Sequence, residues 1–165
     1  VCHRRCPHMI FEGPPGVGKN LLVRAMIQEI FQSDEEQIRQ EKITIQLRAD
    51  LVTKIVVPIK ATSNHIEINL SSLGGYERNV IDLLVNDLHR ARLEADSTES
   101  TVDYKVIVLR EADKLASDVQ HYLHWLMERY QDSCKLIFCC SNANKLQSIS
   151  SLCKVIHVEP PKTEQ

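Results

Sequence analysis

Short apolar runs alternate along this chain with longer segments whose apolar residues recur at helical spacing. Apolar runs that end at a turn or at a charged residue predict buried strands. These predicted buried strands are residues 8–12, 106–109, 136–140 and 155–158. Residues 65–70 alternate between polar and apolar with a period of two, which predicts a further strand. Residues 44–59 are rich in Val, Ile and Thr, which predicts one strand or two.

Three longer segments place apolar residues three or four positions apart, a spacing that predicts a helix with one face on a core. The three stripes are Leu22, Ala25, Met26 and Ile30; then Val80, Ile81, Leu84, Val85 and Leu88; then Leu115, Val119, Tyr122, Leu123, Leu126, Met127 and Tyr130. Strands that alternate with helices favour a mostly parallel sheet with helices on both faces. We therefore expect an α/β fold of three layers.

The composition is that of an ordinary globular domain. With 165 residues, of which 43% are hydrophobic and 25% charged, the chain has the size of one medium domain with its own core. No apolar run reaches the roughly 18 residues of a membrane-spanning helix, so we expect no membrane contact. The net charge of −2 argues against a strongly basic nucleic-acid binder, but it is compatible with DNA contact through one face or through an assembly.

The six cysteines favour a reducing compartment. Cys139 and Cys140 are adjacent within an apolar run, where a disulfide framework is difficult to form, so we expect buried free thiols. The Cys and His residues within residues 2–8 have a spacing that matches no usual zinc pattern. We therefore expect no metal at the start of the chain.

The segment between the first predicted strand and the first predicted helix has the features of a phosphate-binding loop. Residues 13–19 read Gly-Pro-Pro-Gly-Val-Gly-Lys, which fits the pattern G-x-x-x-x-G-K in its usual strand–loop–helix context. Glycines let backbone N–H groups point at a phosphate, the helix start adds positive charge, and Lys19 can reach the outer phosphates. The alternative is a simple helix-entry turn with a solvated Lys19. Such a turn requires neither the G-x-x-x-x-G-K spacing nor the strand–loop–helix context, so the presence of both favours a phosphate-binding loop.

Two positions near this loop depart from the pattern of an efficient nucleotide hydrolase. Asn20 stands where Ser or Thr would place a hydroxyl on Mg²⁺, and Arg110 stands where an Asp would hold the metal. The guanidinium of Arg110 repels a metal ion but can pair with phosphate directly. Glu111 occupies the position of a water-activating base and is the candidate catalytic residue. The alternative is a charged helix start with Asp113 as its N-cap.

Several of these segments, in the same order, resemble the clamp-loader AAA+ family. The similarity covers the family's phosphate-loop opening, its "YHLEVNPSD" strand and turn, its "YKVVVLxEADxL" strand, its "DAQxALRRTMExY" helix and its sensor-1 strand. The segments that carry it are residues 8–19, 64–71, 104–115, 118–130 and 136–140. Within the family, the chain resembles the replication factor C small subunits of the 3/5 type, whose own nucleotide site is degenerate. Asn20 and Arg110 fit that type.

The resemblance implies a fold, a domain organisation and a cofactor. It implies a P-loop NTPase core with five parallel strands at residues 1–160, without the lid and collar of a complete subunit, and a tail at residues 161–165. It implies ATP or ADP as the cofactor, with no Mg²⁺ ligand assigned because of Asn20 and Arg110. The residues that it places at the nucleotide are Gly13, Pro14, Pro15, Gly16, Val17, Gly18, Lys19, Asn20 and Leu21.

The resemblance also implies partners and a location. Replication factor C is a five-subunit nuclear complex that uses ATP to open the sliding clamp and load it on primer–template DNA. The implied partners are therefore other clamp-loader subunits, the sliding clamp and DNA, in replication and repair. Arg78 matches a basic residue by which family members touch DNA. In the sensor turn either Ser141 or Asn142 fits, and we prefer Asn142 because its amide can orient a water. The arginine-finger position holds Leu152, which cannot stabilise phosphate charge on a neighbour.

Classes of function therefore remain open. The first is a clamp-loader subunit that binds nucleotide and hydrolyses it poorly. The second is an active ATPase, or another P-loop phosphotransferase, with altered metal ligands. The third is a diverged paralogue outside the loader that has kept only the fold. Arg110 and Leu152 favour the first and third classes over the second, and the intact phosphate loop favours retained nucleotide binding.

Overall fold

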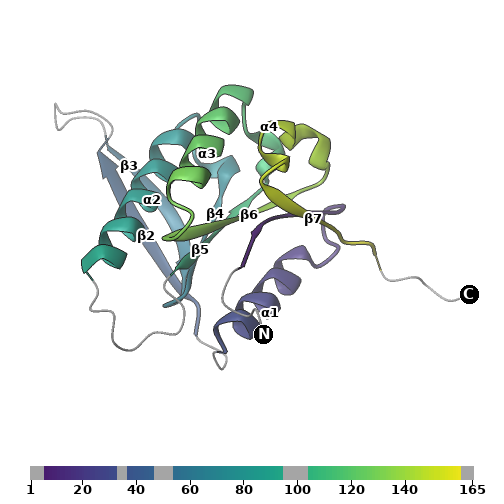
Figure 1. The fold of residues 1–165 in the computed structure, drawn as a ribbon, viewed down its shortest axis with the longest axis horizontal. Coiled ribbons are helices and arrows are strands. Elements are labelled where there is room, and N and C mark those ends of the chain that lie inside the picture. The colour runs from purple at the N-terminus through teal and green to yellow at the C-terminus, as the bar shows by residue number, and fades with distance from the viewer. Residues whose placement is uncertain (1–5, 33–36, 47–53, 95–103, 161–165) are drawn as a thin grey trace, which may run out of the picture.

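The computed structural model describes residues 6–32, 37–46, 54–94 and 104–160, and its centre is one twisted sheet (Figure 1). The strands are β1 (His8–Glu12), β2 (Arg39–Gln46), β3 (Lys54–Ala61), β4 (His65–Asn69), β5 (Lys105–Arg110), β6 (Cys134–Cys140) and β7 (Cys153–His157). The α-helices are α1 (Lys19–Phe31), α2 (Glu77–Glu94), α3 (Ser117–Arg129) and α4 (Gln147–Ser150), with 3₁₀ turns η1 (Leu70–Ser72), η2 (Ala112–Lys114) and η3 (Ala143–Leu146). Residues 2–5 and the predicted tail at residues 161–165 lie outside the described residues.

The described part of the sheet has the strand order β2-β3-β4-β5-β6-β1-β7. The strands β4, β5, β6, β1 and β7 run parallel, which confirms the expected parallel core. β2 and β3 extend it as an antiparallel pair beside β4, so the five expected parallel strands lie within a sheet of seven strands rather than five. The strand or strands predicted at residues 44–59 correspond to the end of β2 and to β3, whereas the first four residues of β2 are exposed and polar and were not predicted.

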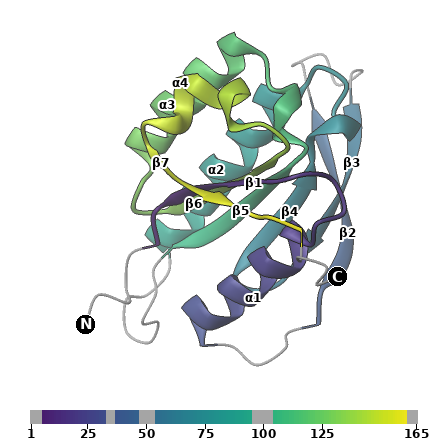
Figure 2. The same ribbon diagram turned by 90° about the vertical axis from the view of Figure 1, so that its right-hand side faces the viewer.

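Helices cover both faces of the sheet, which confirms the three layers. α1 packs on one face, and α2, α3 and α4 pack on the other (Figure 2). Phe11 of β1 faces the core under α1, whereas its neighbour Ile10 faces the core under the other helices. Central strands buried on both faces read as continuous apolar runs, which is why β1, β5 and β6 stand out in the sequence. Within the described residues, no helix is both long enough and apolar enough to cross a bilayer.

β3 separates from β4 after a short paired stretch. The two strands pair at Lys60 with Glu67 and at Ala61 with Ile66, while β3 remains paired with β2 along its length. Pro58 lies beyond the stretch paired with β4, opposite Lys42 of β2. One side of β3 is therefore an edge at Pro58, which is the kind of position where a sheet tolerates proline.

His8 of β1 joins two other elements from within the core. The side chain is buried, and its Nδ1 accepts the backbone N–H of Leu136 in β6 at 3.0 Å. The backbone of Met127 in α3 provides a second hydrogen bond. Burial, with a smaller contribution from Lys135, lowers the pKa of His8 to about 4. His8 is therefore neutral in the folded protein at neutral pH.

The low pKa of His8 predicts a pH-dependent loss of stability. Its pKa is about 4 when folded, against 6.5 for an unperturbed histidine. As pH falls from 6.5 towards 4, the unfolded chain therefore binds a proton that the folded chain does not, and stability falls, by on the order of 3 kcal/mol. We expect His8→Asn to flatten the fall in the free energy of unfolding between pH 6.5 and 4.5, measured by urea denaturation.

The matched control for that measurement is the exposed His121. His121→Asn replaces an exposed imidazole by the same side chain, so it controls for the substitution itself. Equal slopes for the wild type and His8→Asn over this window would contradict the assignment.

Candidate functional site

The loop at residues 13–18 connects the end of β1 to the start of α1. The N–H of Gly13 donates to the carbonyl of Cys140 at 3.1 Å, and the N–H of Val158 donates to the carbonyl of Glu12 at 2.7 Å. A Cβ atom on Gly13 would lie 2.5 Å from the carbonyl oxygen of Val158. The close approach of the chain after β7 therefore leaves room only for glycine at this position.

Gly18 ends the loop and is the N-cap of α1. Its φ angle is +94° and that of Gly16 is +77°, both in the left-handed region that favours glycine. The first turn of α1 carries Lys, Asn and two Leu residues, so its own side chains offer no negative charge to the helix start. The unpaired N–H groups at a helix start favour an anion. The loop thus has the backbone that a phosphate site requires.

Lys19 lies across this loop, and a pocket opens beside it. Its ammonium group donates to the carbonyl oxygens of Gly13 and Cys140, the second at 3.1 Å. The pocket has a volume of about 340 Å³. Its lining residues are Pro15, Gly16, Lys19, Asn20, Arg110, Glu111, Asp113, Lys114, Cys139, Cys140 and Ser141. It lies where the parallel strands β1, β5 and β6 end, which is the usual position of ligand sites in open α/β sheets.

The predicted nucleotide-binding residues fall into two groups around this pocket. Those that line it are Pro15, Gly16, Lys19 and Asn20. Those that lie in the loop or the first turn of α1 without lining it are Gly13, Pro14, Val17, Gly18 and Leu21. The side chain of Leu21 is 71% exposed and belongs to the outer surface of α1. Contact between these residues and a nucleotide stays a prediction.

Arg110 is the last residue of β5 and also lines the pocket. Its side chain has no hydrogen bond or ion pair with any residue that the structure describes. Asn69, its neighbour across the sheet, uses its side-chain oxygen to accept from the N–H and hydroxyl of Ser71. Arg110 also lines a second cavity of about 380 Å³, towards β3 and β4. Within the described part of the chain, a cation without a hydrogen bond or ion pair therefore lies between two cavities, one of which is lined in part by the phosphate loop.

Glu111 follows Arg110 with a φ angle of +56° and lines the same pocket. A hydrogen bond with Ser71 and the ammonium group of Lys114, 3.7 Å away, lower the pKa of Glu111. A carboxylate with a lowered pKa is a weaker proton acceptor, so these contacts oppose the role of a general base.

Asp113 joins the loops that follow β5 and β6. Its carboxylate accepts the backbone N–H of Ser141 at 2.9 Å and that of Asn142 at 3.1 Å. The N-cap of α3 is instead Ala116, so the interpretation of Asp113 as a helix cap is wrong. The Asp113 carboxylate instead binds the backbone of a loop that is distant in the sequence. No local sequence pattern reveals this contact.

The two candidates for the sensor position face different surroundings. Ser141 lines the pocket. Asn142 is exposed, and its side-chain oxygen accepts the N–H of Asn144 at 3.0 Å, which caps η3. The structure thus brings Ser141 to the pocket, and the preference for Asn142 stays a prediction.

The described cysteines are free thiols, as expected. Cys6, Cys134, Cys139 and Cys140 are buried, and Cys153 is partly buried. Burial raises the pKa of Cys139 to about 11 and that of Cys140 to about 12. Both thiols in the pocket lining therefore stay protonated at neutral pH. Among the described residues, no group of three or more His, Cys, Asp or Glu side chains is arranged to hold a metal ion.

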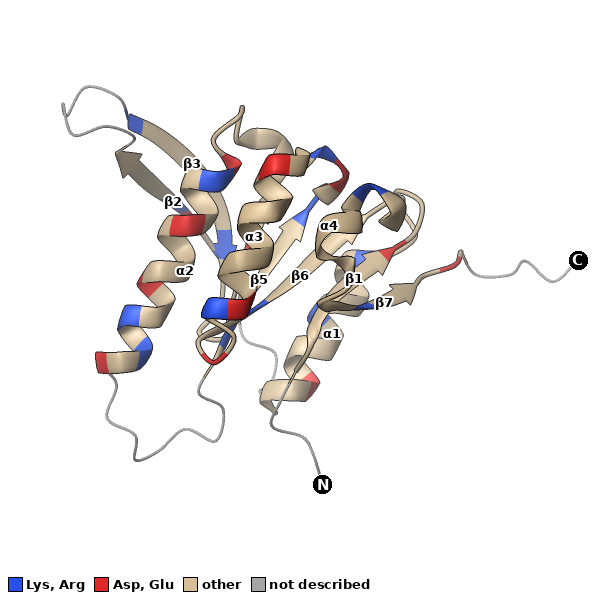
Figure 3. Cartoon of the chain, turned by 45° about the horizontal axis from the view of Figure 1, so that its top comes forward, with Lys and Arg blue, Asp and Glu red and all other residues tan. Residues whose placement is uncertain are grey.

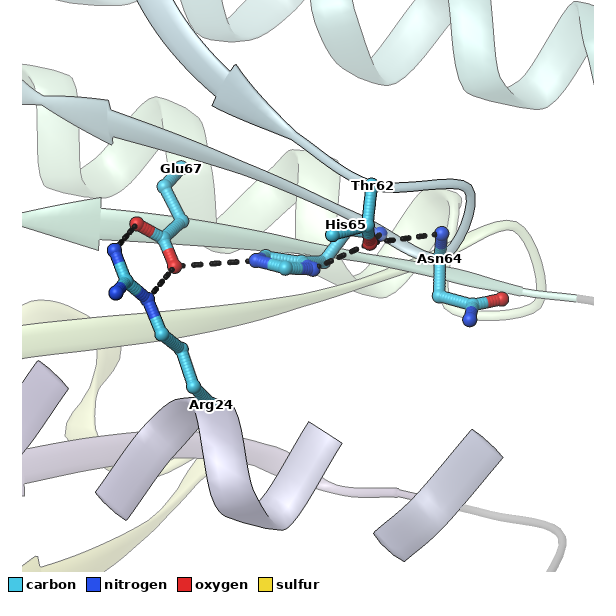
Figure 4. A network of polar contacts seen from close by, with 5 residues as sticks. All are labelled: Arg24, Thr62, Asn64, His65 and Glu67. Carbon is cyan, nitrogen blue, oxygen red and sulfur yellow. Dashed lines mark hydrogen bonds and ion pairs between the residues drawn. The ribbon is translucent and has the colours of Figure 1, made fainter. Parts of the chain in front are cut away.

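A buried ion pair ties α1 to β4 (Figure 4). Arg24 of α1 donates from Nε and Nη2 to the two carboxylate oxygens of Glu67, at 3.0 and 3.1 Å, and His65 Nε2 donates to the same carboxylate at 3.1 Å. Burial alone would raise the pKa of Glu67, but the bonds from His65 and Arg24 outweigh it and lower the pKa to about 2. This network was not predicted from the sequence, although His65 and Glu67, two polar residues on one face of a predicted strand, were a signal for it.

The predicted DNA residue, Arg78, lies on the surface shared by α2 and α3. Its guanidinium carbon is 3.9 Å from the centroid of the Tyr122 ring, which stacks on Trp125 at 5.8 Å. Trp125 is 48% exposed, and the guanidinium carbon of Arg129 lies 5.2 Å from the centroid of its ring. Figure 3 shows acidic and basic segments mixed along α2, so this helix has no uniformly basic face. Contact between Arg78 and DNA stays a prediction.

Leu152, at the expected arginine-finger position, lies just before β7. Its side chain is partly buried and packs against the larger hydrophobic core. An apolar side chain that packs on its own domain offers no charge to a neighbouring subunit.

Comparison with known proteins agrees with this geometry. A family model described as "ATPase family associated with various cellular activities (AAA)" matches residues 9–155. The chain is 31% identical over 167 residues to "Replication factor C subunit 3" of Arabidopsis thaliana, covering 100% of this chain and 47% of that protein. It is 32% identical over 168 residues to "Replication factor C subunit 5" of Oryza sativa subsp. japonica, with 100% and 47% covered. It is 34% identical over 159 residues to "Replication factor C subunit 3" of Homo sapiens, with 96% and 44% covered. The chain spans about half the length of these curated relatives.

The buried ion pair yields a prediction on stability. Arg24→Met should lower the free energy of unfolding by about 2 to 3 kcal/mol, because the buried Glu67 carboxylate loses its bidentate partner. The matched control is Arg39→Met, which removes an ion pair of 2.9 Å with Glu41 in which both side chains are well exposed. That control should cost less than about 1 kcal/mol. If chemical denaturation gave equal losses in the free energy of unfolding for the two variants, the stabilising role of Arg24 would be contradicted.

Proposed function

Because this chain belongs to the AAA family of ATPases, we propose that it binds ATP or ADP at residues 13–21 as part of a replication factor C-like clamp-loader subunit. The observation that carries the proposal is the phosphate loop, which combines the backbone of a phosphate site with Lys19 and an open pocket. The proposed nucleotide contacts are the loop backbone, Lys19 and the residues that line the pocket beside them.

We infer that nucleotide hydrolysis by this subunit is weak. Asn20 and Arg110 occupy the positions from which P-loop enzymes hold Mg²⁺. Glu111, the proposed base, is engaged by Ser71 and Lys114, and its pKa is lowered. Nucleotide binding needs the loop and its positive charge, whereas hydrolysis also needs suitable residues at positions 20, 110 and 111. The site should therefore retain nucleotide binding better than hydrolysis.

The proposed partners follow from the named relatives. The chain would act with other clamp-loader subunits in the nucleus, assisting the loading of a sliding clamp on primer–template DNA in replication and repair. Leu152 would give no finger to a neighbouring site, because it packs on its own core. Arg78 is exposed and held over an aromatic ring, so it is the proposed contact to a DNA phosphate.

A sensor and a second candidate function belong to the same site. Asn142 is the proposed sensor, and Ser141 is the alternative because it lines the pocket. Glu111 also lines the pocket, and this favours the alternative of an active ATPase with altered metal ligands. The two functions differ in the rate of hydrolysis.

Steady-state hydrolysis separates these alternatives. We expect the full-length wild-type protein to bind ADP in isothermal titration and the Lys19→Ala variant not to bind it. We also expect the wild type to hydrolyse ATP no faster than the Lys19→Ala variant does. Glu111→Gln should leave the rate unchanged, because no efficient base is removed. Rapid turnover that Lys19→Ala or Glu111→Gln abolishes would instead support the active ATPase.

Association separates a loader subunit from a diverged paralogue. Affinity purification of the full-length protein should recover the other clamp-loader subunits in fixed stoichiometry, identified by mass spectrometry. Recovery of the protein alone, under conditions in which a known loader subunit retains its partners, would favour the paralogue.

A further inference from the structure

The pocket beside the phosphate loop lacks the ligand chemistry that Mg²⁺ requires. P-loop proteins hold the ion through a hydroxyl after the loop lysine and an acidic side chain after a later strand, and here Asn20 and Arg110 line the pocket at those positions. Of the two carboxylates in the lining, Glu111 is paired with Lys114, and Asp113 accepts backbone N–H groups. The residues present therefore do not fit a bound Mg²⁺ ion.

Arg110 lines this pocket, and among the described residues its side chain has no hydrogen bond or ion pair, although its charge helps to lower the pKa of Glu111. Arg110 also lines the second cavity, and Glu67 is the buried acidic residue in that lining. The Glu67 carboxylate is already bonded to Arg24 and His65. Arg110 and Lys19 both act on the Cys139 thiol, where their positive charges oppose the effect of burial on its pKa. Both cations line the same pocket, together with Pro15 and Gly16 of the loop between β1 and α1.

We infer that this site binds its nucleotide without a divalent cation, and that the Arg110 guanidinium neutralises phosphate charge in place of the metal. This inference rests on the proposed function, since it concerns the same nucleotide. A guanidinium offers several N–H donors in a planar fork that matches phosphate oxygens and stays charged at any physiological pH. Beside Lys19, Arg110 then provides one of the two positive charges that Mg²⁺ would supply.

The inference predicts an unusual preference between metal-free and metal-bound nucleotide. A nucleotide complexed with Mg²⁺ carries less negative charge and presents a cation to Arg110, so it should bind less well than the free form. The measurement is isothermal titration of ADP into the full-length, nucleotide-free protein, once with excess EDTA and once with excess MgCl₂ at matched ionic strength. ADP is the probe because it is not consumed. We expect the Kd in EDTA to equal or fall below the Kd in MgCl₂.

Variants test the role of Arg110 itself. Arg110→Gln should weaken ADP binding in EDTA about tenfold, because one charge-assisted contact to phosphate is lost. The matched control is Lys105→Gln, since Lys105 is the exposed first residue of the same strand and does not line the pocket. It should change the Kd by less than about threefold. The double change Asn20→Thr with Arg110→Asp should reverse the preference, giving tighter binding in MgCl₂ than in EDTA.

The outcomes distinguish this inference from the proposed function. Absence of ADP binding in both conditions would overturn both. Wild-type binding that weakens tenfold or more in EDTA would overturn the inference alone and leave nucleotide binding in place. Equal losses in Arg110→Gln and Lys105→Gln would also overturn it, because the overall positive charge of the domain would then explain the binding. The wild-type comparison needs no variant, so a variant that unfolds does not decide the result.

Discussion

The position of the phosphate loop depends on one buried carboxylate. Glu67 lies in β4, three strands away from β1, yet it holds Arg24 of the helix that the loop opens. Burying a carboxylate is unfavourable unless its oxygens are bonded, and Arg24 and His65 provide those bonds. The bond at Arg24, just over one turn beyond Lys19, therefore fixes how α1 lies across the sheet. It thereby also fixes the start of the helix.

A second consequence of the fold is that polar groups near the pocket already have structural roles. Asp113 bridges to the loop after β6, Glu111 pairs with Lys114, and Asn142 caps a 3₁₀ turn. These bonds make the end of the sheet a rigid frame for the loop. They also leave fewer groups available for proton transfer or metal binding. Such a site is suited to binding an anion but poorly suited to catalysing hydrolysis.

The sequence predicts the parts of this structure that depend on local pattern. β1, β5 and β6 are apolar on both faces, and Gly16 and Gly18 have the backbone that their spacing predicts. The prediction of one strand or two at residues 44–59 missed the first half of β2, because its exposed polar residues have no apolar pattern. The bonds of Asp113 were also beyond reach, because its partners lie 28 and 29 residues along the chain and meet it only after the sheet forms. Likewise, the packing of Leu152 against the core depends on tertiary contacts.

The charged strand β2 has a consequence for the behaviour of the protein in solution. A parallel core that ended at β4 would present its unpaired backbone groups to any passing strand, which is a common route to aggregation. Within the described chain, that side of the sheet instead ends in β2, whose first four residues are exposed and include Arg39, Glu41 and Lys42. Lysine and arginine on an outer strand oppose the addition of another strand, since their charge would have to be buried. The exposed, charged first half of β2 therefore protects the solubility of the sheet.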